Sequence, residues 1–153
     1  MIKIPNSLEK EQLKELFRKI AFDDYYQYVN SLNCIEDYLI ESNQDDQFEF
    51  ILCKEKEIYG YIRFKTYYGK IMYVCNCVNF TKESKYRFGK DLLKIFEIFK
   101  KNGYMKVGFL VAEGNPAKKM YEKIKGVRYI GYKEKETLHR GKLIDMYVYE
   151  LFL

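Results

Sequence analysis

The sequence predicts one domain with a mixed α/β fold, in which a central sheet carries helices on both faces. Three observations lead to this prediction. Three strand-like segments follow one another closely between residues 48 and 79, and the hydrophobic pattern then changes from a period of two to the period of a helix. Beyond that point strand-like and helix-like segments alternate. The length of 153 residues suits one domain with a hydrophobic core of its own.

The N-terminal part predicts a short strand followed by two helices. Met1 to Ile4 is expected to be the strand, and Asn6 with Glu9 three residues later forms a capping box. A second helix is expected from about Asp24 to Ile40. The first helix is marked by apolar residues at helical spacing: Leu13, Leu16, Phe17 and Ile20.

The middle of the chain predicts an antiparallel meander. The segments Phe48 to Lys54, Ile58 to Tyr67 and Ile71 to Asn79 are rich in aromatic and β-branched residues. Short polar turns at Glu55–Glu57 and Tyr68–Lys70 separate them. Connections this short require antiparallel pairing between successive strands.

The second half predicts alternating helices and strands. A strand–helix–strand connection requires a parallel, right-handed crossover. A mixed sheet of this kind can open a crevice where neighbouring strands separate, and ligands favour such places. The loop that holds His139 is charged and is expected to be mobile. The expected elements are a helix from Phe88 to Lys101, a strand from Met105 to Val111, a helix from Asn115-Pro116 to Gly126, and strands from Val127 to Lys133 and from Leu143 to Leu153.

The charge pattern does not favour a nucleic-acid partner. The net charge is +5 at pH 7, and lysines alternate with glutamates in segments such as Lys54–Glu57 and Lys133–Glu136. This mixing is typical of a solvated surface, whereas a protein that binds nucleic acid more often gathers its basic residues on one face. A small anionic ligand is enough to account for the excess of positive charge.

The cysteine and hydropathy patterns predict a cytoplasmic protein without a metal centre. Cys75 and Cys77 lie in a strand-like run, and His139 is the single histidine, so the sequence lacks ligands at metal spacing. Together with Cys34 and Cys53 they are expected to be free, buried thiols, as in a reducing compartment. The N-terminus has no signal core and no run is long enough to span a membrane, so no membrane partner is expected.

The stretch from Cys77 to Leu93 is the centre of the functional prediction. It combines a strand end, a short basic loop containing Gly89, and the first turn of an amphipathic helix. Such a junction points free backbone N–H groups and the positive end of a helix dipole toward one spot. Phosphate is the usual anion in such a place, so a phosphorylated cofactor is expected there.

Two motifs resemble those of the GNAT superfamily of acetyl-CoA-dependent N-acetyltransferases. The first, Ser84-Lys85-Tyr86-Arg87-Phe88-Gly89, is similar to the family's phosphate loop, Gln/Arg-x-x-Gly-x-Gly/Ala, but departs from it at Ser84 and Arg87. The second, Asn115-Pro116-Ala117-Lys118-Lys119-Met120-Tyr121-Glu122, is similar to the family segment Asn-Pro-Ala-x-x-x-Tyr-Glu. The resemblance is strongest from about Ile71 to Gly131.

The resemblance implies a single N-acetyltransferase-like domain over residues 1–153, with a mostly antiparallel mixed sheet and a parallel pair that splays at its centre. It implies that acetyl-CoA is the cosubstrate and that a primary amine of a small molecule or protein attacks its acetyl group directly. Backbone N–H groups near Val78 and Phe80 would bind the acetyl carbonyl, if a bulge there turned them outward. Asn115 would bond the pantetheine or phosphate arm, and Tyr121 would face the CoA sulfur and donate to it. The other residues expected to bind the cofactor are Lys85, Tyr86, Arg87, Phe88, Gly89 and Lys90.

The acceptor and the general base are left open by the sequence, and so are two other functions. Ser84 and Arg87 also fit a domain that binds or senses acyl-CoA with little or no turnover. A homodimer through Leu143–Leu153 is possible if that strand is an exposed edge. The candidates for the base are Glu113, His139, Asp145 and Glu83. An RNA- or protein-binding module would use Lys100, Lys101, Lys106, Lys118, Lys119 and Lys123.

Overall fold

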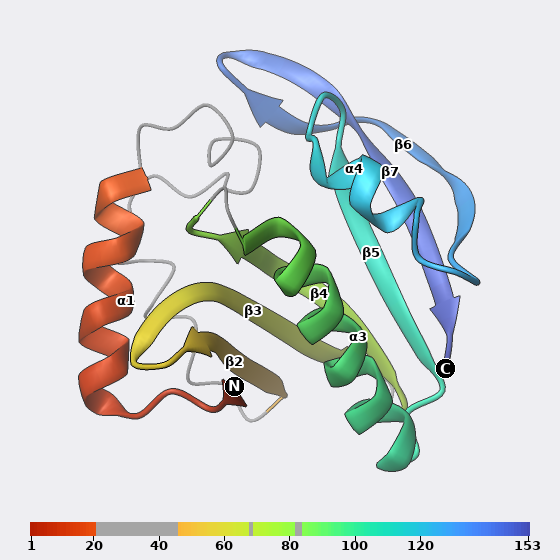
Figure 1. The fold of residues 1–153 in the computed structure, drawn as a ribbon. Coiled ribbons are helices and arrows are strands. Elements are labelled where there is room, and N and C mark those ends of the chain that lie inside the picture. Colours follow the sequence, from red (N-terminus) through yellow and green to blue (C-terminus); the bar gives the residue numbers. More distant parts are fainter. Residues whose placement is uncertain (21–45, 68, 82–83) are drawn as a thin grey trace.

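The computed structural model describes residues 1–20, 46–67, 69–81 and 84–153. These residues form one seven-stranded sheet with helices packed against it (Figure 1). The elements, in chain order, are β1 (Ile2–Lys3), α1 (Ser7–Ile20), β2 (Gln47–Lys54), β3 (Glu57–Tyr67), β4 (Ile71–Asn79), α3 (Lys85–Lys101), β5 (Lys106–Ala112), α4 (Ala117–Tyr121), β6 (Arg128–His139) and β7 (Lys142–Phe152).

The sheet confirms the predicted mixed topology. Its strand order is β1-β2-β3-β4-β5-β7-β6, and all neighbouring pairs are antiparallel except β4 with β5. The predicted meander is β2, β3 and β4, and α3 is the crossover that makes β5 parallel to β4. The β4–β5 ladder runs only from the pair Ile71 and Lys106 to the pair Val74 and Phe109. Beyond it the two strands diverge toward the upper end of the molecule (Figure 1).

Helices cover both faces of the sheet, as predicted. On one face α3 buries Leu92, Ile95 and Phe96 against strand residues that include Phe64 and Phe109. On the other face α1 packs its own core cluster, which contains Leu13, Phe17, Tyr61 and Val78. The alternation of side chains along β4 therefore decides which helix each residue faces.

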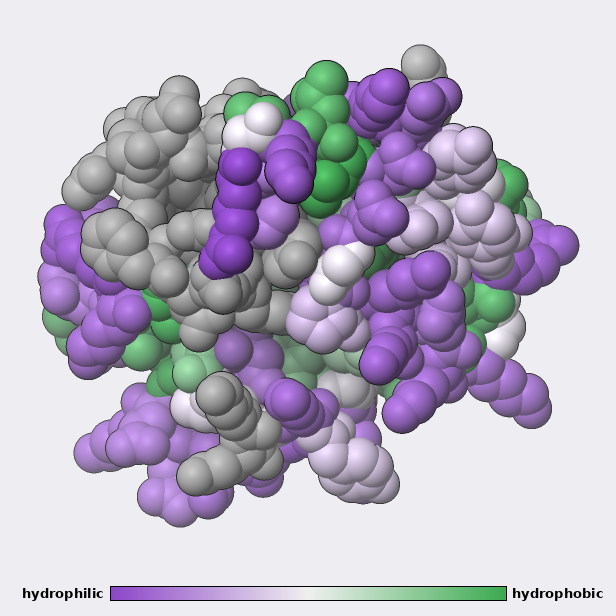
Figure 2. Space-filling model, turned by 90° about the horizontal axis from the view of Figure 1, so that it is seen from above, coloured by the Kyte–Doolittle hydropathy of each residue, from purple (hydrophilic) through white to green (hydrophobic). Residues whose placement is uncertain are grey.

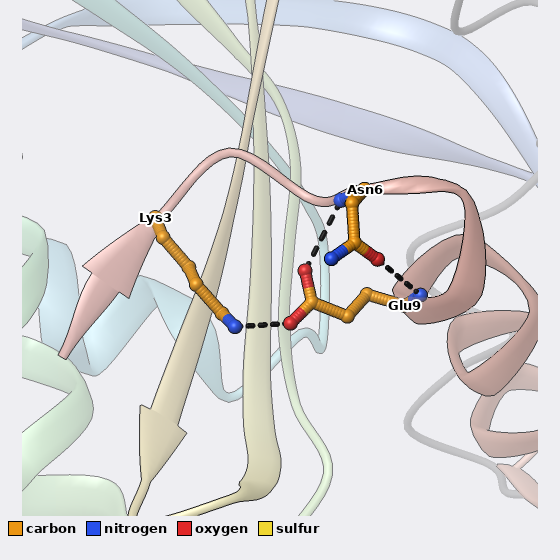
Figure 3. Close-up of polar contacts among 3 residues, drawn as sticks. All are labelled: Lys3, Asn6 and Glu9. Atoms are coloured by element: carbon orange, nitrogen blue, oxygen red, sulfur yellow. Dashed lines mark hydrogen bonds and ion pairs between the residues drawn. The ribbon is translucent and has the colours of Figure 1, made fainter.

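The predicted capping box is present at the start of α1 (Figure 3). The Asn6 Oδ1 accepts the Glu9 backbone N–H at 2.9 Å, and the Glu9 carboxylate accepts the Asn6 N–H at 3.1 Å. Lys3 also forms an ion pair with Glu9. Because Lys3 belongs to β1, the same carboxylate joins the first strand to the first helix.

The two helices of the second half differ in length from the prediction. Helix α3 begins at Lys85 rather than at Phe88. The apolar pattern could not predict its first three residues, because they are exposed and have no apolar periodicity. Helix α4 ends at Tyr121 instead of continuing to Gly126. From Lys123 on, the backbone N–H groups bond three residues back, as from Ile124 to the Tyr121 carbonyl at 3.0 Å. This is the pattern of tight turns rather than of an α-helix.

The C-terminal hairpin corrects two further predictions. Strand β6 extends to His139, where a mobile loop was expected, and Arg140 and Gly141 turn the chain directly into β7. Both turn residues have positive φ, 49° and 75°, as a two-residue hairpin turn requires. The edge strand at this end of the sheet is β6, since β7 lies between β5 and β6. The proposed dimer through Leu143–Leu153 therefore loses its premise.

Other predictions are tested in part. The expected second helix, Asp24 to Ile40, lies outside the described residues. Of the described cysteines, Cys53 and Cys77 are buried and free, but Cys75 is exposed. None of the described helices is long and apolar enough to cross a bilayer. Within the described residues no three His, Cys, Asp or Glu side chains gather as a metal site would need.

Candidate functional site

A cavity of about 530 Å³ occupies the gap where β4 and β5 diverge. A β-bulge in β4 helps to shape it: Arg63 pairs with Asn76 and Phe64 with Val74, so Cys75 is an extra residue. A bulge bends its strand and re-aims nearby side chains. The residues that line the cavity are Tyr67, Tyr73, Val74, Cys75, Asn76, Cys77, Leu110, Val111, Ala112, Asn115, Ala117, Tyr121 and Met146.

The lining residues come from both faces of the sheet. Cys77 belongs to the core cluster beneath α3, together with Tyr121. The next residue, Val78, belongs to the cluster beneath α1. Since side chains two residues apart on a strand share a face, Asn76 points to the α1 side with Val78. The cavity thus connects the α3–α4 face of the sheet with the opposite face through the gap.

Tyr121 lies at the α4 wall of this cavity and is only 4% exposed. Its ring packs on Phe109, with ring centroids 4.7 Å apart. Its hydroxyl forms a hydrogen bond with the Cys77 thiol. Burial raises the pKa of Cys77 to about 12, although this hydrogen bond acts in the opposite direction. The tyrosine of the second motif is therefore held by an aromatic ring and a neutral thiol, with its hydroxyl at the gap.

Asn115 also lines the cavity, and it shapes the start of α4. Its Oδ1 accepts the Ala117 backbone N–H at 2.8 Å, and its own N–H donates to the Ala112 carbonyl at 3.0 Å. Its backbone carbonyl accepts from Lys118 at 3.1 Å. These bonds set the turn between β5 and α4, so Asn115 positions the helix that carries Tyr121.

The start of α3 leaves its first backbone N–H groups without a side-chain cap. The Ser84 hydroxyl donates to Asn79 Oδ1 at 2.6 Å instead of capping the helix. Lys85, Tyr86 and Arg87 are exposed, and the first turn has no acidic residue. Uncapped amides, the helix dipole and cationic side chains all favour an anion at this terminus.

The cationic side chains at this terminus are held by aromatic rings. The Lys90 ammonium lies 4.5 Å from the centre of the Tyr86 ring, and the Arg87 guanidinium lies 6.0 Å from the centre of the Tyr59 ring. Gly89 lies between Arg87 and Lys90 in the chain, and a Cβ added there would meet no atom within 4 Å. The structure therefore leaves open space beside the one glycine of the first motif.

Phe88 and Asp91 anchor the first turns of α3 to the sheet. Phe88 is buried in the core, against Gly60, so only its backbone is left for the predicted role in cofactor binding. The buried Asp91 accepts hydrogen bonds from the Tyr59 hydroxyl and from Lys94. Burial acts to raise the pKa of Asp91, but the bonds from Lys94 and Tyr59 outweigh it and hold that pKa below its ordinary value.

The structure corrects the expected roles of the Val78 and Phe80 backbone. Phe80 donates its N–H to the Tyr59 carbonyl at 2.9 Å, so this group is used within the sheet. N–H groups two residues apart on an antiparallel strand point to the same side, and that of Val78 therefore also points toward β3. Those of Cys77 and Asn79 point the other way, toward the gap. The reason is that the bulge lies at Cys75, not at the strand end.

The candidate bases do not meet at the cavity. Among the described residues, Glu113, His139 and Asp145 are all absent from its lining. Asp145 accepts the Lys135 backbone N–H at 2.9 Å, and its carbonyl accepts that of Glu113 at 2.8 Å. Glu83 lies outside the described residues.

Sequence reasoning missed the residues of β4 that meet the gap. Asn76 is 2% exposed and lines the cavity, whereas the sequence pattern predicts only that it belongs to a strand. One signal was present: it is the single strongly polar residue inside the apolar run Met72–Val78, and a polar residue in a buried strand needs a reason. Tyr67 and Tyr73, which also line the cavity, gave no comparable signal.

Solved structures with this fold include many N-acetyltransferases. An N-acetyltransferase from Staphylococcus aureus Mu50 superposes with a TM-score of 0.80 over 99% of this chain and 96% of its own, at 14% identity. The ribosomal-protein-S18-alanine N-acetyltransferase of Escherichia coli gives 0.77 over 99% and 92%, at 12% identity. The spermidine N-acetyltransferase of Vibrio cholerae, solved with CoA and spermine, gives 0.77 over 99% and 94%, at 14% identity.

No model of a protein family matches the sequence, and no curated protein matches it either. At identities this low, likeness to solved structures establishes the fold. The chain has the GNAT fold, as the two motifs predicted, with the parallel strand pair β4–β5 splayed at the centre of the sheet.

Proposed function

We propose that this protein is an N-acetyltransferase that moves the acetyl group of acetyl-CoA to a primary amine by direct attack. The observation that carries the proposal is the buried Tyr121, whose hydroxyl lies at the cavity between the diverging strands β4 and β5. The fold supports it, because N-acetyltransferases acting on different acceptors share this arrangement.

The residues around the gap fit an acyl-CoA. The cavity volume of about 530 Å³ lies within the range of small-molecule sites. The uncapped first turn of α3, with Lys85, Arg87 and Lys90 around it, suits a diphosphate. Asn79 connects the gap with the start of α3. Its side chain accepts a hydrogen bond from the Ser84 hydroxyl, and its backbone continues the strand from Cys77. A thioester arm in the gap and phosphates at α3 would therefore follow one path.

Acetyl-CoA supplies the activated acyl group when it is bound. The reaction forms a C–N bond, breaks the C–S bond, removes a proton from the amine and returns one to the sulfur. The N–H groups of Cys77 and Asn79 point toward the gap and would hold the acetyl carbonyl, in place of those of Val78 and Phe80. The Tyr121 hydroxyl would hydrogen-bond the departing sulfur.

The proton balance is compatible with Tyr121 as the donor. A free thiol titrates near ~8.5 and a tyrosine near ~10, so full transfer between unperturbed groups is uphill by about 2 kcal/mol. A hydrogen bond that stabilises the thiolate is therefore sufficient, and transfer can follow it. The Cys77 thiol, which is the present partner of the hydroxyl, keeps it aimed into the gap.

A second function is favoured by one observation. Arg87 takes the place of a glycine of the family motif and covers the Tyr59 ring, which fits a domain that binds acyl-CoA without turnover. Two measurements separate the functions: a melting scan with CoA, acetyl-CoA and longer acyl-CoAs, and a thiol-release assay with a panel of amines. Melting shifts together with thiol release support the transferase. Melting shifts without release for any amine support the binding domain, and the absence of both overturns the assignment.

A further inference from the structure

Asn76 is a buried polar side chain at the cavity with an unmet need for hydrogen bonds. It is 2% exposed, and both its Nδ2 and its Oδ1 are buried without a hydrogen-bond partner within the described part of the chain. Leaving a buried donor and acceptor unsatisfied is unfavourable, and native proteins rarely do so without a reason. A ligand group that enters the cavity would satisfy this amide.

The position of Asn76 assigns it to the acceptor side of the gap. It points to the face opposite Tyr121, because Cys77 and Tyr121 share the α3–α4 face and Asn76 is the neighbour of Cys77 on the strand. The Cβ atoms of adjacent strand residues point to opposite faces, so an amine that reaches the sulfur beside Tyr121 passes Asn76. A polar group of the acceptor that meets Asn76 would therefore lie close to the attacking nitrogen.

The surroundings of Asn76 restrict the chemistry of that group. Apolar and aromatic side chains accompany it on this side: Tyr67, Tyr73, Leu110 and Met146. Tyr67 and Tyr73 form an edge-to-face pair with ring centroids 5.2 Å apart. None of the described lining residues is charged, although the charge of Arg63, the buried cross-strand partner of Asn76, acts on Cys75. It is the unmet donor and acceptor of Asn76 itself that favour an uncharged amide. The group that complements a carboxamide, with one donor and one acceptor, is another amide.

We propose that Asn76 binds an amide adjacent to the attacking amine, so that the acceptors are α-amino amides such as amino-acid amides and peptide N-termini. This inference rests on the proposed acetyl transfer. The bulge at Cys75 places the amide at the cavity, and the apolar wall of Tyr67, Tyr73, Leu110 and Met146 suits an uncharged side chain on the acceptor.

The test compares three ligands that share a phenyl ring and an amine. L-Phenylalaninamide carries the amide, 2-phenylethylamine lacks it, and L-phenylalanine carries a carboxylate in its place. Each is measured by the melting shift it causes with CoA present and by thiol release with acetyl-CoA. We expect phenylalaninamide to bind, and to react, about tenfold or more better than the other two. A glycyl dipeptide amide of phenylalanine then distinguishes a peptide N-terminus from a free amide.

The variant is Asn76→Leu, which keeps the size of the side chain and removes its polarity. We expect the preference for the amide to fall to near one, and the melting temperature of the free protein to rise or stay constant, because an unsatisfied buried amide is removed. Asn102→Leu, at the far end of α3, is the control and should retain the preference. A parent protein without amide preference, or an Asn76→Leu protein that retains it, overturns the inference. Weaker CoA binding with an unchanged amide preference also overturns it.

A failure of the proposed acetyl transfer and a failure of the proposed role of Asn76 would give different results. The amide preference is read from melting shifts and needs no turnover. Missing thiol release with every amine would count against acetyl transfer, while equal melting shifts for the three ligands would count against the role of Asn76 alone.

Discussion

The Tyr121 hydroxyl and the Cys77 thiol share a hydrogen bond across the gap between α4 and β4. The two residues are far apart in sequence, and each comes from an element whose local pattern says nothing of the other. Burial keeps the thiol neutral, since it raises the pKa of Cys77 to about 12. The pair therefore holds a proton-bearing hydroxyl at the cavity.

Replacing Tyr121 by phenylalanine should slow acetyl transfer and leave the fold intact. The ring still packs on Phe109, and only the hydroxyl is lost. We expect kcat to fall by about 10²-fold or more, the range for a positioned acid, with little change in the melting shift caused by CoA. Tyr129→Phe, on an exposed ring of β6, is the control. Equal kcat in the parent and Tyr121→Phe proteins would remove Tyr121 from the mechanism.

Thiol reagents should distinguish Cys77 from Cys75 in the folded protein. Burial raises the pKa of both thiols, but Cys75 is exposed to the reagent whereas Cys77 is buried. In a Cys34→Ser background, which removes the thiol outside the described residues, Cys75 should be labelled first. Mass spectrometry of the labelled protein locates the modification. Rapid labelling of Cys77 before unfolding would contradict its placement.

Alkaline pH should destabilise the protein partly through Cys77. Its pKa is raised from 9.0 to about 12 on folding, so the unfolded chain releases this proton first. The contribution to the free energy of unfolding is complete below about pH 9 and is lost as pH rises toward the folded value, by up to about 1.4 kcal/mol per pH unit. The free energy of unfolding can be measured by urea denaturation from pH 8 upward, roughly to pH 10. It should decline less steeply with pH in Cys77→Ala than in the parent protein. Parallel declines would contradict the raised pKa.

Replacing Gly89 by alanine should change stability and ligand binding in opposite directions. An added Cβ meets no atom within 4 Å, and alanine favours a helix interior over glycine by about 0.5–1 kcal/mol. The melting temperature of the free protein should rise, while the shift caused by CoA should shrink if phosphates approach this turn. Gly60→Ala is the contrasting control, because its Cβ would lie 2.8 Å from the buried Phe88 ring and should destabilise by about 1–3 kcal/mol. An undiminished CoA shift in Gly89→Ala would argue against phosphate binding at this position.

Removing the cap of α1 should lower stability without affecting the cavity. Asn6→Ala loses the bond to the Glu9 N–H, and the expected cost is about 1 kcal/mol. Ser7→Ala, one residue further, is the control. Chemical denaturation gives the difference, and the CoA-induced melting shift should stay the same for both variants. A loss of that shift in Asn6→Ala would show a coupling that the packing does not predict.

Figure 2 shows the molecule from above, and on this face the described residues are mainly hydrophilic, with apolar ones in separate patches. The extent to which each element is buried explains which elements could be predicted from the sequence. Strands β2, β3 and β4 and the helices α1 and α3 bury one or both faces, so their apolar residues repeat at the period of the element. Strand β6 is exposed over most of its length, and its charged segment looked like a loop because no face of it needs apolar residues.

The sequence by itself determined the mixed sheet, the capped first helix and the two motifs, because each depends on residues close together in the chain. The tertiary structure alone decided which groups meet at the gap. The bulge at Cys75 shifts the alternation of β4, so it is the Cys77 and Asn79 N–H groups, not those of Val78 and Phe80, that point toward β5, and Asn76 that comes to the cavity. A register shift is set by the pairing of β4 with β3 and by the end of its ladder with β5. Such long-range pairing leaves no period in the local sequence from which it could be read.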